Sequence, residues 1–68
     1  MTRNEILAQI YRMAEKLSKE WNYEEDDKMW ELCSDWNREH EDEEIFMMQD
    51  EEENRFYVED DYFLYPER

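Results

Sequence analysis

The sequence predicts an α+β fold in which a two-helix hairpin precedes a short antiparallel β-hairpin or three-strand sheet. Apolar residues recur at three- and four-residue steps up to about residue 40, as they do on one face of a helix. After residue 44 they occur in short runs rich in aromatic and β-prone residues. Helix-capping residues, Thr2 and Asn22, precede the two helical stretches. With 68 residues, the chain is expected to form a single small domain over residues 1–68.

The first helix is predicted over residues 3–20. The run Thr2-Arg3-Asn4-Glu5 has the form of a capping box, and Met1 and Ile6 fall at the positions of a hydrophobic staple. Glu15 and Lys19 form a favourable pair four residues apart. The expected core face consists of Ile6, Leu7, Ile10, Met13, Ala14, Leu17 and Trp21.

The second helix is predicted from Tyr23 to Glu41, with Asn22 as its N-cap. Four acidic residues, 24–27, fall in its first turns, where the helix dipole favours negative charge. We expect it to pack on the first helix and to bury its tryptophans against Ile10, Leu17 and Trp21. The residues expected on its buried face are Tyr23, Trp30, Cys33, Trp36 and Asn37, with Met29 and Leu32 at the margins.

Strands are predicted at residues 45–48 and 55–58, joined by a polar turn in which Asn54 is best suited to a positive φ. A third strand is predicted over residues 62–65, ended by Pro66. The chain has no glycine, which tight hairpin turns prefer. An all-α alternative therefore stays open, in which a helix continues through Ile45 and Met48.

The charge is large and unevenly distributed. Residues 1–23 carry four basic and three acidic side chains, whereas residues 24–68 carry four basic and nineteen acidic ones, for a net charge of −14. Such a field repels nucleic acid and anionic membranes and attracts basic surfaces. No apolar run approaches the roughly 20 residues of a membrane span, and no signal peptide is evident. We expect a basic protein partner, no direct contact with nucleic acid or membrane, and a cytoplasmic location, which also suits the lone Cys33.

Enzyme chemistry finds little support in the sequence. Cys33 and His40 lie seven residues apart on one predicted helix, so about 10 Å separates their Cα atoms, too far for a nucleophile and its base. Together they supply too few ligands for zinc, and the calcium loop of an EF-hand needs a glycine. We expect no enzymatic activity, no cofactor and no dedicated metal site. A weak divalent-cation sensor remains a third option.

An acidic ridge is the sharpest feature of the second helix. Its members repeat every four residues and would wind slowly along the surface: Asp27, Glu31, Asp35, Glu39 and Glu43. Like charges at this spacing destabilise a helix by roughly 0.2–0.5 kcal/mol per pair. A local rule broken in this way often marks function, although a solvated acidic face also aids solubility.

Further acidic clusters extend the candidate partner-binding surface. They comprise Glu41, Asp42 and Glu44, then Asp50, Glu51, Glu52 and Glu53, then Glu59, Asp60 and Asp61. Four aromatic residues near these clusters exceed what so small a core can hide, namely Tyr57, Tyr62, Phe63 and Tyr65. Exposed aromatics supply much of the binding free energy at interface centres. Of these, we assign Tyr57 and Tyr62 to the surface.

Residues 24–61 resemble the phage-type DNA-mimic inhibitors in physical style and not in motif. The shared features are small size, extreme acidity, tyrosines among carboxylates and an acidic helix face. Proteins of that class include anti-restriction and anti-CRISPR inhibitors. The resemblance implies a non-enzymatic inhibitor that occupies the nucleic-acid-binding site of a host defence or DNA-processing protein. If the chain is encoded by a bacteriophage, it implies action in the host cytoplasm.

A second function is also compatible with the sequence. In it, the chain is an acidic regulatory, adaptor or antitoxin-like module whose aromatic surface carries the affinity while charge only steers the encounter. A homodimer would add core area that 68 residues lack, but it would also bring like charges together.

Overall fold

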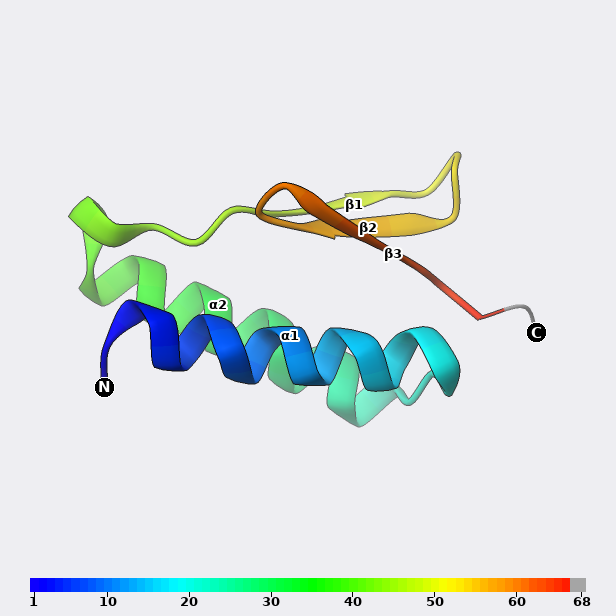
Figure 1. Ribbon diagram of the computed structural model, residues 1–68, viewed down its shortest axis with the longest axis horizontal. Helices are drawn as coiled ribbons and strands as arrows, with labels where there is room; N and C mark the ends of the chain where they lie inside the picture. The colour runs from blue at the N-terminus through cyan, green and yellow to red at the C-terminus, as the bar shows by residue number, and fades with distance from the viewer. Residues whose placement is uncertain (67–68) are drawn as a thin grey trace.

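A helical hairpin lies under a three-stranded antiparallel sheet in the computed structural model, which describes residues 1–66 (Figure 1). The strand order is β1-β2-β3. The predicted α+β class is confirmed in its three-strand form, and the all-α alternative is wrong. The elements are α1 (Arg3–Lys19), α2 (Tyr23–Glu39), a one-turn 3-10 helix η1 (Glu41–Glu43), β1 (Met47–Asp50), β2 (Arg55–Val58) and β3 (Asp61–Leu64).

Helix α1 begins with the predicted capping box. The Thr2 hydroxyl accepts a hydrogen bond from the backbone N–H of Glu5 (3.3 Å), and the Glu5 carboxylate accepts one from the N–H of Thr2 (3.0 Å). Met1 is 73% exposed, so the expected staple buries little of it. The fully buried stripe comprises Ile6, Ile10, Ala14 and Leu17, with Leu7, Met13 and Trp21 packed beside it.

Helix α2 begins where predicted, because the Asn22 side chain accepts a hydrogen bond from the N–H of Glu25 (3.2 Å). Its buried face is rotated from the expected one and consists of Met29, Cys33 and Trp36. Trp30 is only partly buried, and Tyr23 is 66% exposed. Tyr23 lies about 120° around the helix from Met29, outside the stripe that faces the core.

The end of α2 comes two residues earlier than predicted. His40 leaves the helical conformation (φ −133°, ψ 68°) and stacks its ring on Trp36, with centroids 3.7 Å apart. The indole N–H of Trp36 then donates to the carbonyl of Glu43 (2.8 Å). Because this bond satisfies a largely buried donor, it holds η1 folded back against the helix. Glu43 therefore lies in η1 and not on α2.

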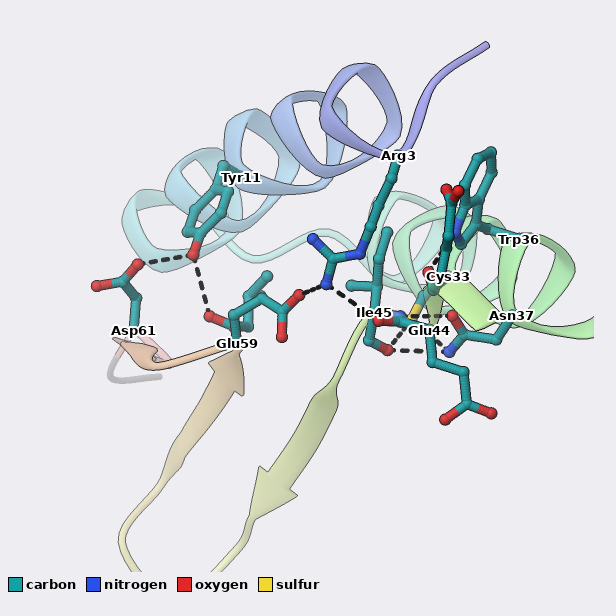
Figure 2. Close-up of polar contacts among 11 residues, drawn as sticks. Arg3, Tyr11, Cys33, Trp36, Asn37, Glu44, Ile45, Glu59 and Asp61 are labelled. Atoms are coloured by element: carbon teal, nitrogen blue, oxygen red, sulfur yellow. Dashed lines mark hydrogen bonds and ion pairs between the residues drawn. The ribbon is translucent and has the colours of Figure 1, made fainter. Parts of the chain in front are cut away.

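Ile45 is joined to α2 by an amide side chain. Asn37 Nδ2 donates to the carbonyl of Ile45 (2.9 Å), and Asn37 Oδ1 accepts from the N–H of Ile45 (2.7 Å), as Figure 2 shows. The Cys33 thiol donates to the same carbonyl (3.4 Å). The Ile45 side chain is 1% exposed. Since the Asn37 amide supplies the partners that a neighbouring strand would otherwise supply, β1 begins at Met47 and not at Ile45 as predicted.

The sheet has one covered and one uncovered face. Phe56 and Val58 of β2 are fully buried toward the helices. Their neighbour Tyr57 points the opposite way and pairs in register with Met48 of β1 and Tyr62 of β3. The third strand begins one residue before the predicted start. The faces are therefore an inner one on the core and an outer one turned away from both helices.

Both hairpin turns use a non-glycine residue at positive φ. Asn54 (φ 53°) is the residue predicted for this role, whereas Glu59 (φ 55°) was not foreseen. Glu59 is held there by its N–H, which donates to the carbonyl of Phe46 (2.8 Å), and by an ion pair with Arg3 of α1. These partners offset the steric cost of a left-handed conformation in a side chain with a Cβ.

Tyr11 joins α1 to the turn between β2 and β3. Its hydroxyl lies 3.2 Å from the carbonyl of Val58 and 2.6 Å from Asp61 Oδ2 (Figure 2). Burial, together with the hydrogen bond to Asp61, raises the pKa of Tyr11 from 10.0 to about 12. The protonated hydroxyl is therefore part of the contact between the two layers.

Asn37→Ala is expected to destabilise the fold strongly. It leaves the N–H of Ile45 without its partner, at roughly 1–3 kcal/mol for a buried group, and leaves the Ile45 carbonyl with only the weak Cys33 thiol donor. Urea unfolding followed by circular dichroism measures the change, with Ser34→Ala at an exposed position of the same helix as control. A loss equal to that of the control would contradict the role given to Asn37.

Tyr11→Phe is expected to lower the free energy of unfolding by about 1–2 kcal/mol at neutral pH. In the wild type, the contribution of Tyr11 is present below its unfolded pKa of 10.0 and is lost as the pH rises toward about 12, since the unfolded chain ionises first. The difference in the free energy of unfolding between the wild type and Tyr11→Phe should therefore become smaller as the pH rises from 10.0 to about 12. Tyr65, whose pKa is also raised to about 12, is common to both. A gap that stays constant in alkaline urea titrations would rule out this account.

Candidate functional site

The negative charge is only sparsely neutralised within the fold. In residues 1–66, the ion pairs join Arg3 to Glu59, Arg38 to Asp35 and Arg55 to Glu53. Of the other basic residues in the described chain, Arg12, Lys16 and Lys19 are exposed on α1, and Lys28 is exposed on α2. The surface is therefore mildly basic along α1 and strongly acidic along α2, η1 and the sheet turns.

Four of the five predicted ridge members lie on α2. Asp27, Glu31 and Glu39 are exposed, while Asp35 is half-buried and its carboxylate pairs with Arg38 (2.6 Å). These residues lie off the stripe of α2 that is buried in the core. The fifth predicted member, Glu43, is separated from them by the break at His40.

Beyond the ridge, the C-terminal end of α2 carries a second acidic group. Residues 41–44 are all acidic and all exposed, and they follow Glu39 directly after His40. The C-terminus of a helix carries a partial negative charge, so carboxylates are unfavourable there. Arg3 approaches this segment, but it donates to the backbone carbonyl of Glu44 (3.0 Å) and not to a carboxylate of residues 41–44. We call Asp27, Glu31, Asp35, Glu39 and residues 41–44 the acidic strip.

Some of the predicted acidic residues of the two turns bind other groups of the chain, and the others do not. Asp50 accepts from the N–H of Glu53 (3.2 Å), and Glu53 pairs with Arg55 (3.0 Å). In the other turn, Glu59 pairs with Arg3 and Asp61 binds Tyr11. The remaining residues, Glu51, Glu52 and Asp60, are exposed.

The outer face of the sheet is aromatic. Tyr57 and Tyr62 lie side by side with ring centroids 6.3 Å apart, and the Arg55 guanidinium is 5.1 Å from the Tyr62 ring. The large apolar or aromatic residues that are 44–56% exposed here are Phe46, Met48, Tyr62 and Leu64. Phe63 and Tyr65, which were also expected at the surface, instead pack on Phe56 at 5.4 and 5.0 Å. We call Phe46, Met48, Tyr57, Tyr62 and Leu64 the outer sheet face.

The ridge part of the acidic strip and the outer sheet face do not form one surface. The ridge part of the strip lies off the buried stripe of α2, in the helical layer that Figure 1 shows on one side of the sheet. Tyr57 and Tyr62 pair in register on the face of the sheet opposite Phe56 and Val58, which are buried toward the helices. The predicted face of carboxylates with aromatics among them is therefore divided into two surfaces. This division depends on the packing of the sheet over the helices, for which the sequence carries no local signal.

A cavity that the sequence did not reveal lies where the α1–α2 connection, the β1–β2 turn and the segment after β3 meet. Its volume is about 580 Å³, and its lining includes Trp21, Asp26, Gln49, Glu51, Asn54 and Tyr65. Only Glu51 among them was assigned to a binding surface beforehand. The others come from separate segments with no common motif, so sequence spacing could not have grouped them.

Cys33 and His40, the two residues considered for catalysis, are packed against neighbouring side chains of the fold. Cys33 is buried, which raises the pKa of its thiol, and His40 is stacked on Trp36. Within residues 1–66, no cluster of three or more His, Cys, Asp or Glu side chains is arranged to hold a metal ion. Across the same residues, neither helix has the length and apolar character needed to cross a membrane.

Comparison of the chain with protein-family models, with curated proteins and with solved structures found no match.

Glu31→Lys is expected to stabilise the protein. Glu31 has Asp27 four residues before it and Asp35 four residues after it, so the change converts two repulsive pairs into attractive ones, while the one favourable pair with Lys28, three residues before it, becomes repulsive. The expected gain is about 1 kcal/mol at low salt, smaller at high salt. Thermal unfolding at two salt concentrations measures it. Glu15→Lys on α1, which breaks the pair with Lys19, is the control and should destabilise. A loss of stability in Glu31→Lys would assign Glu31 a structural role.

Proposed function

We propose that this chain is a non-enzymatic inhibitor that occupies the nucleic-acid-binding site of a host defence or DNA-processing protein, with carboxylates in place of phosphates. One observation carries the proposal: apart from Asp35, which pairs with Arg38, the acidic strip is exposed and forms no ion pair within residues 1–66, and most of it lies at the C-terminal end of α2 and in η1, where negative charge opposes folding. A marginal 68-residue domain gains no stability from this arrangement.

The spacing of the strip suits a surface that binds phosphates. Carboxylates four residues apart on α2 lie about 6 Å apart along the helix axis, so the ridge presents negative charges at regular intervals, as the phosphates of one nucleic-acid strand do. Lysine and arginine side chains that hold phosphates would form charge-assisted hydrogen bonds with these carboxylates. The net charge of −14 would also steer the chain toward a basic channel.

The basic residues of α1 support a defined orientation on such a target. Arg12, Lys16 and Lys19 are exposed on α1, where basic residues outnumber acidic ones, whereas α2 is predominantly acidic in spite of Lys28 and Arg38. A basic channel would attract the strip and repel this side of α1. A solubility function alone would not require the two signs of charge to be separated.

The proposal is tested with Glu31→Lys/Glu39→Lys, in which both changed residues are exposed ridge members. Asp35 is left unchanged because it pairs with Arg38. The control, Glu15→Lys/Glu20→Lys, makes the same change in net charge at exposed positions of α1 and its C-cap. Targets captured from host lysate by the wild type are identified and purified, and their binding to labelled duplex DNA or RNA is followed by fluorescence anisotropy.

The wild type should displace the nucleic acid competitively, and the ridge variant should be weaker by roughly tenfold or more, since it loses charge-assisted contacts. The control should stay close to the wild type. Equal weakening of both variants would show that only bulk charge matters. A captured target that keeps its nucleic acid would overturn the proposal.

A second function, an acidic adaptor or antitoxin-like module, is favoured by the outer sheet face. Tyr62 and Leu64 are each 56% exposed on it. For such a module, Tyr62→Ser/Leu64→Ser should abolish capture of the target, and affinity should fall only slightly with salt. For the inhibitor, affinity should fall steeply with salt and this variant should retain it. Calorimetry at two ionic strengths separates the two functions.

A further inference from the structure

The cavity beside Trp21 has aromatic walls that the fold holds in place. The Tyr65 ring packs on the buried Phe56 with centroids 5.0 Å apart. The Tyr65 N–H donates to the carbonyl of Asn54 (3.0 Å), and Asn54 Nδ2 donates to the carbonyl of Tyr65 (3.4 Å). Trp21, from the α1–α2 connection, meets Tyr23 edge to face at 6.0 Å. Two aromatic side chains from segments distant in the sequence therefore line one space.

Two carboxylates face the same cavity, and no described basic residue neutralises either of them. The ion pairs within residues 1–66 use Asp35, Glu53 and Glu59, whereas Asp26 and Glu51 line the cavity. Asp26 is half-buried and accepts a hydrogen bond from the indole N–H of Trp30 (3.1 Å). Burial raises the pKa of Asp26 in spite of that bond. Burial and then the charges of Asp26 and Glu51 raise the pKa of Tyr65 to about 12.

The chemistry of this lining selects a cation with a flat or apolar body. Carboxylates exclude anions, and aromatic faces attract cations through their ring quadrupoles. The volume of about 580 Å³ lies within the range of roughly 300–1,000 Å³ that organic ligands occupy. The remaining polar lining, Gln49 and Asn54, is uncharged. A guanidinium fits better than an ammonium because it is planar, stacks on rings and bonds carboxylates through two N–H groups.

We propose that this cavity binds a cationic side chain of a protein partner, an arginine in preference to a lysine, between Trp21 and Tyr65 and against the carboxylates of Asp26 and Glu51. The site is separate from the acidic strip and does not depend on nucleic-acid mimicry by α2. It gives the chain a means of selecting one basic partner among many, since a shaped pocket distinguishes side chains that a charged surface attracts alike.

The test is a titration with N-acetyl-arginine N-methylamide, followed by the NMR signal of the Trp21 indole N–H and by calorimetry. The blocked citrulline derivative, which is neutral and nearly the same shape, is the matched ligand control, and the blocked lysine derivative is the third ligand. Wild type and Arg68→Ala are both used, because Arg68 is a cationic side chain two residues after Pro66 of the cavity lining. Binding of the arginine derivative at millimolar concentration in either background is the expected result.

Glu51→Gln and Asp26→Asn should each weaken the arginine derivative by roughly tenfold, as the loss of a charge-assisted hydrogen bond implies. Glu52→Gln, an exposed neighbour in the same turn and outside the cavity lining, should leave it unchanged. The proposal would be overturned if the citrulline derivative bound as tightly as the arginine derivative. Equal effects of Glu51→Gln and Glu52→Gln on the affinity would overturn it too. Free L-arginine binding more tightly than the blocked form would overturn the assignment to a side chain. These outcomes need no inhibited target, so they are independent of the proposed inhibition.

Discussion

The two hydrogen bonds between the Asn37 amide and the backbone of Ile45 hold the helical layer and the sheet in one register. The chain has just left α2 through η1, and Ile45 has no strand beside it that could satisfy its backbone groups. Asn37 supplies both partners at a largely buried position, which fixes where β1 starts. A slip of one residue there would exchange the inner Met47 with the outer Met48, because side chains alternate across a strand. The arrangement of the sheet, and of everything on it, follows from this connection.

A chain with a net charge of −14 folds because its carboxylates are kept out of the core. Among residues 1–66, the buried set contains no charged side chain. Several carboxylates instead form hydrogen bonds or ion pairs that stabilise the fold at the surface. Glu5 completes a helix cap, Glu59 and Asp61 bind α1 through Arg3 and Tyr11, and Asp50 shapes a turn. The carboxylates left over, chiefly those of the acidic strip, repel one another without stabilising the fold, and this is why they carry the functional argument.

Three surfaces with different chemistry result. The acidic strip follows α2 and η1, the outer sheet face covers the opposite layer, and the cavity lies between the α1–α2 connection and the β1–β2 turn. Charge then governs the encounter at long range, while aromatic and shaped surfaces govern selection at contact. The acidic strip and the outer sheet face can be changed separately, whereas the cavity shares Trp21 and Tyr65 with the packing around the core.

Features that depend on neighbours within a few residues could be predicted from the sequence. They include the fold class, both helix starts through Thr2 and Asn22, the core stripe of α1, the positive φ of Asn54 and the extreme acidity of residues 24–61. Tertiary packing sets the early end of α2, the late start of β1 and the partial burial of Phe63 and Tyr65. It also separated the ridge from the tyrosines and brought Trp21, Asp26, Glu51 and Tyr65 around one cavity. The reason is physical: capping and periodicity act over single turns, whereas the partners of Trp36, Asn37 and Phe56 come from segments that meet only when the sheet packs on the helices.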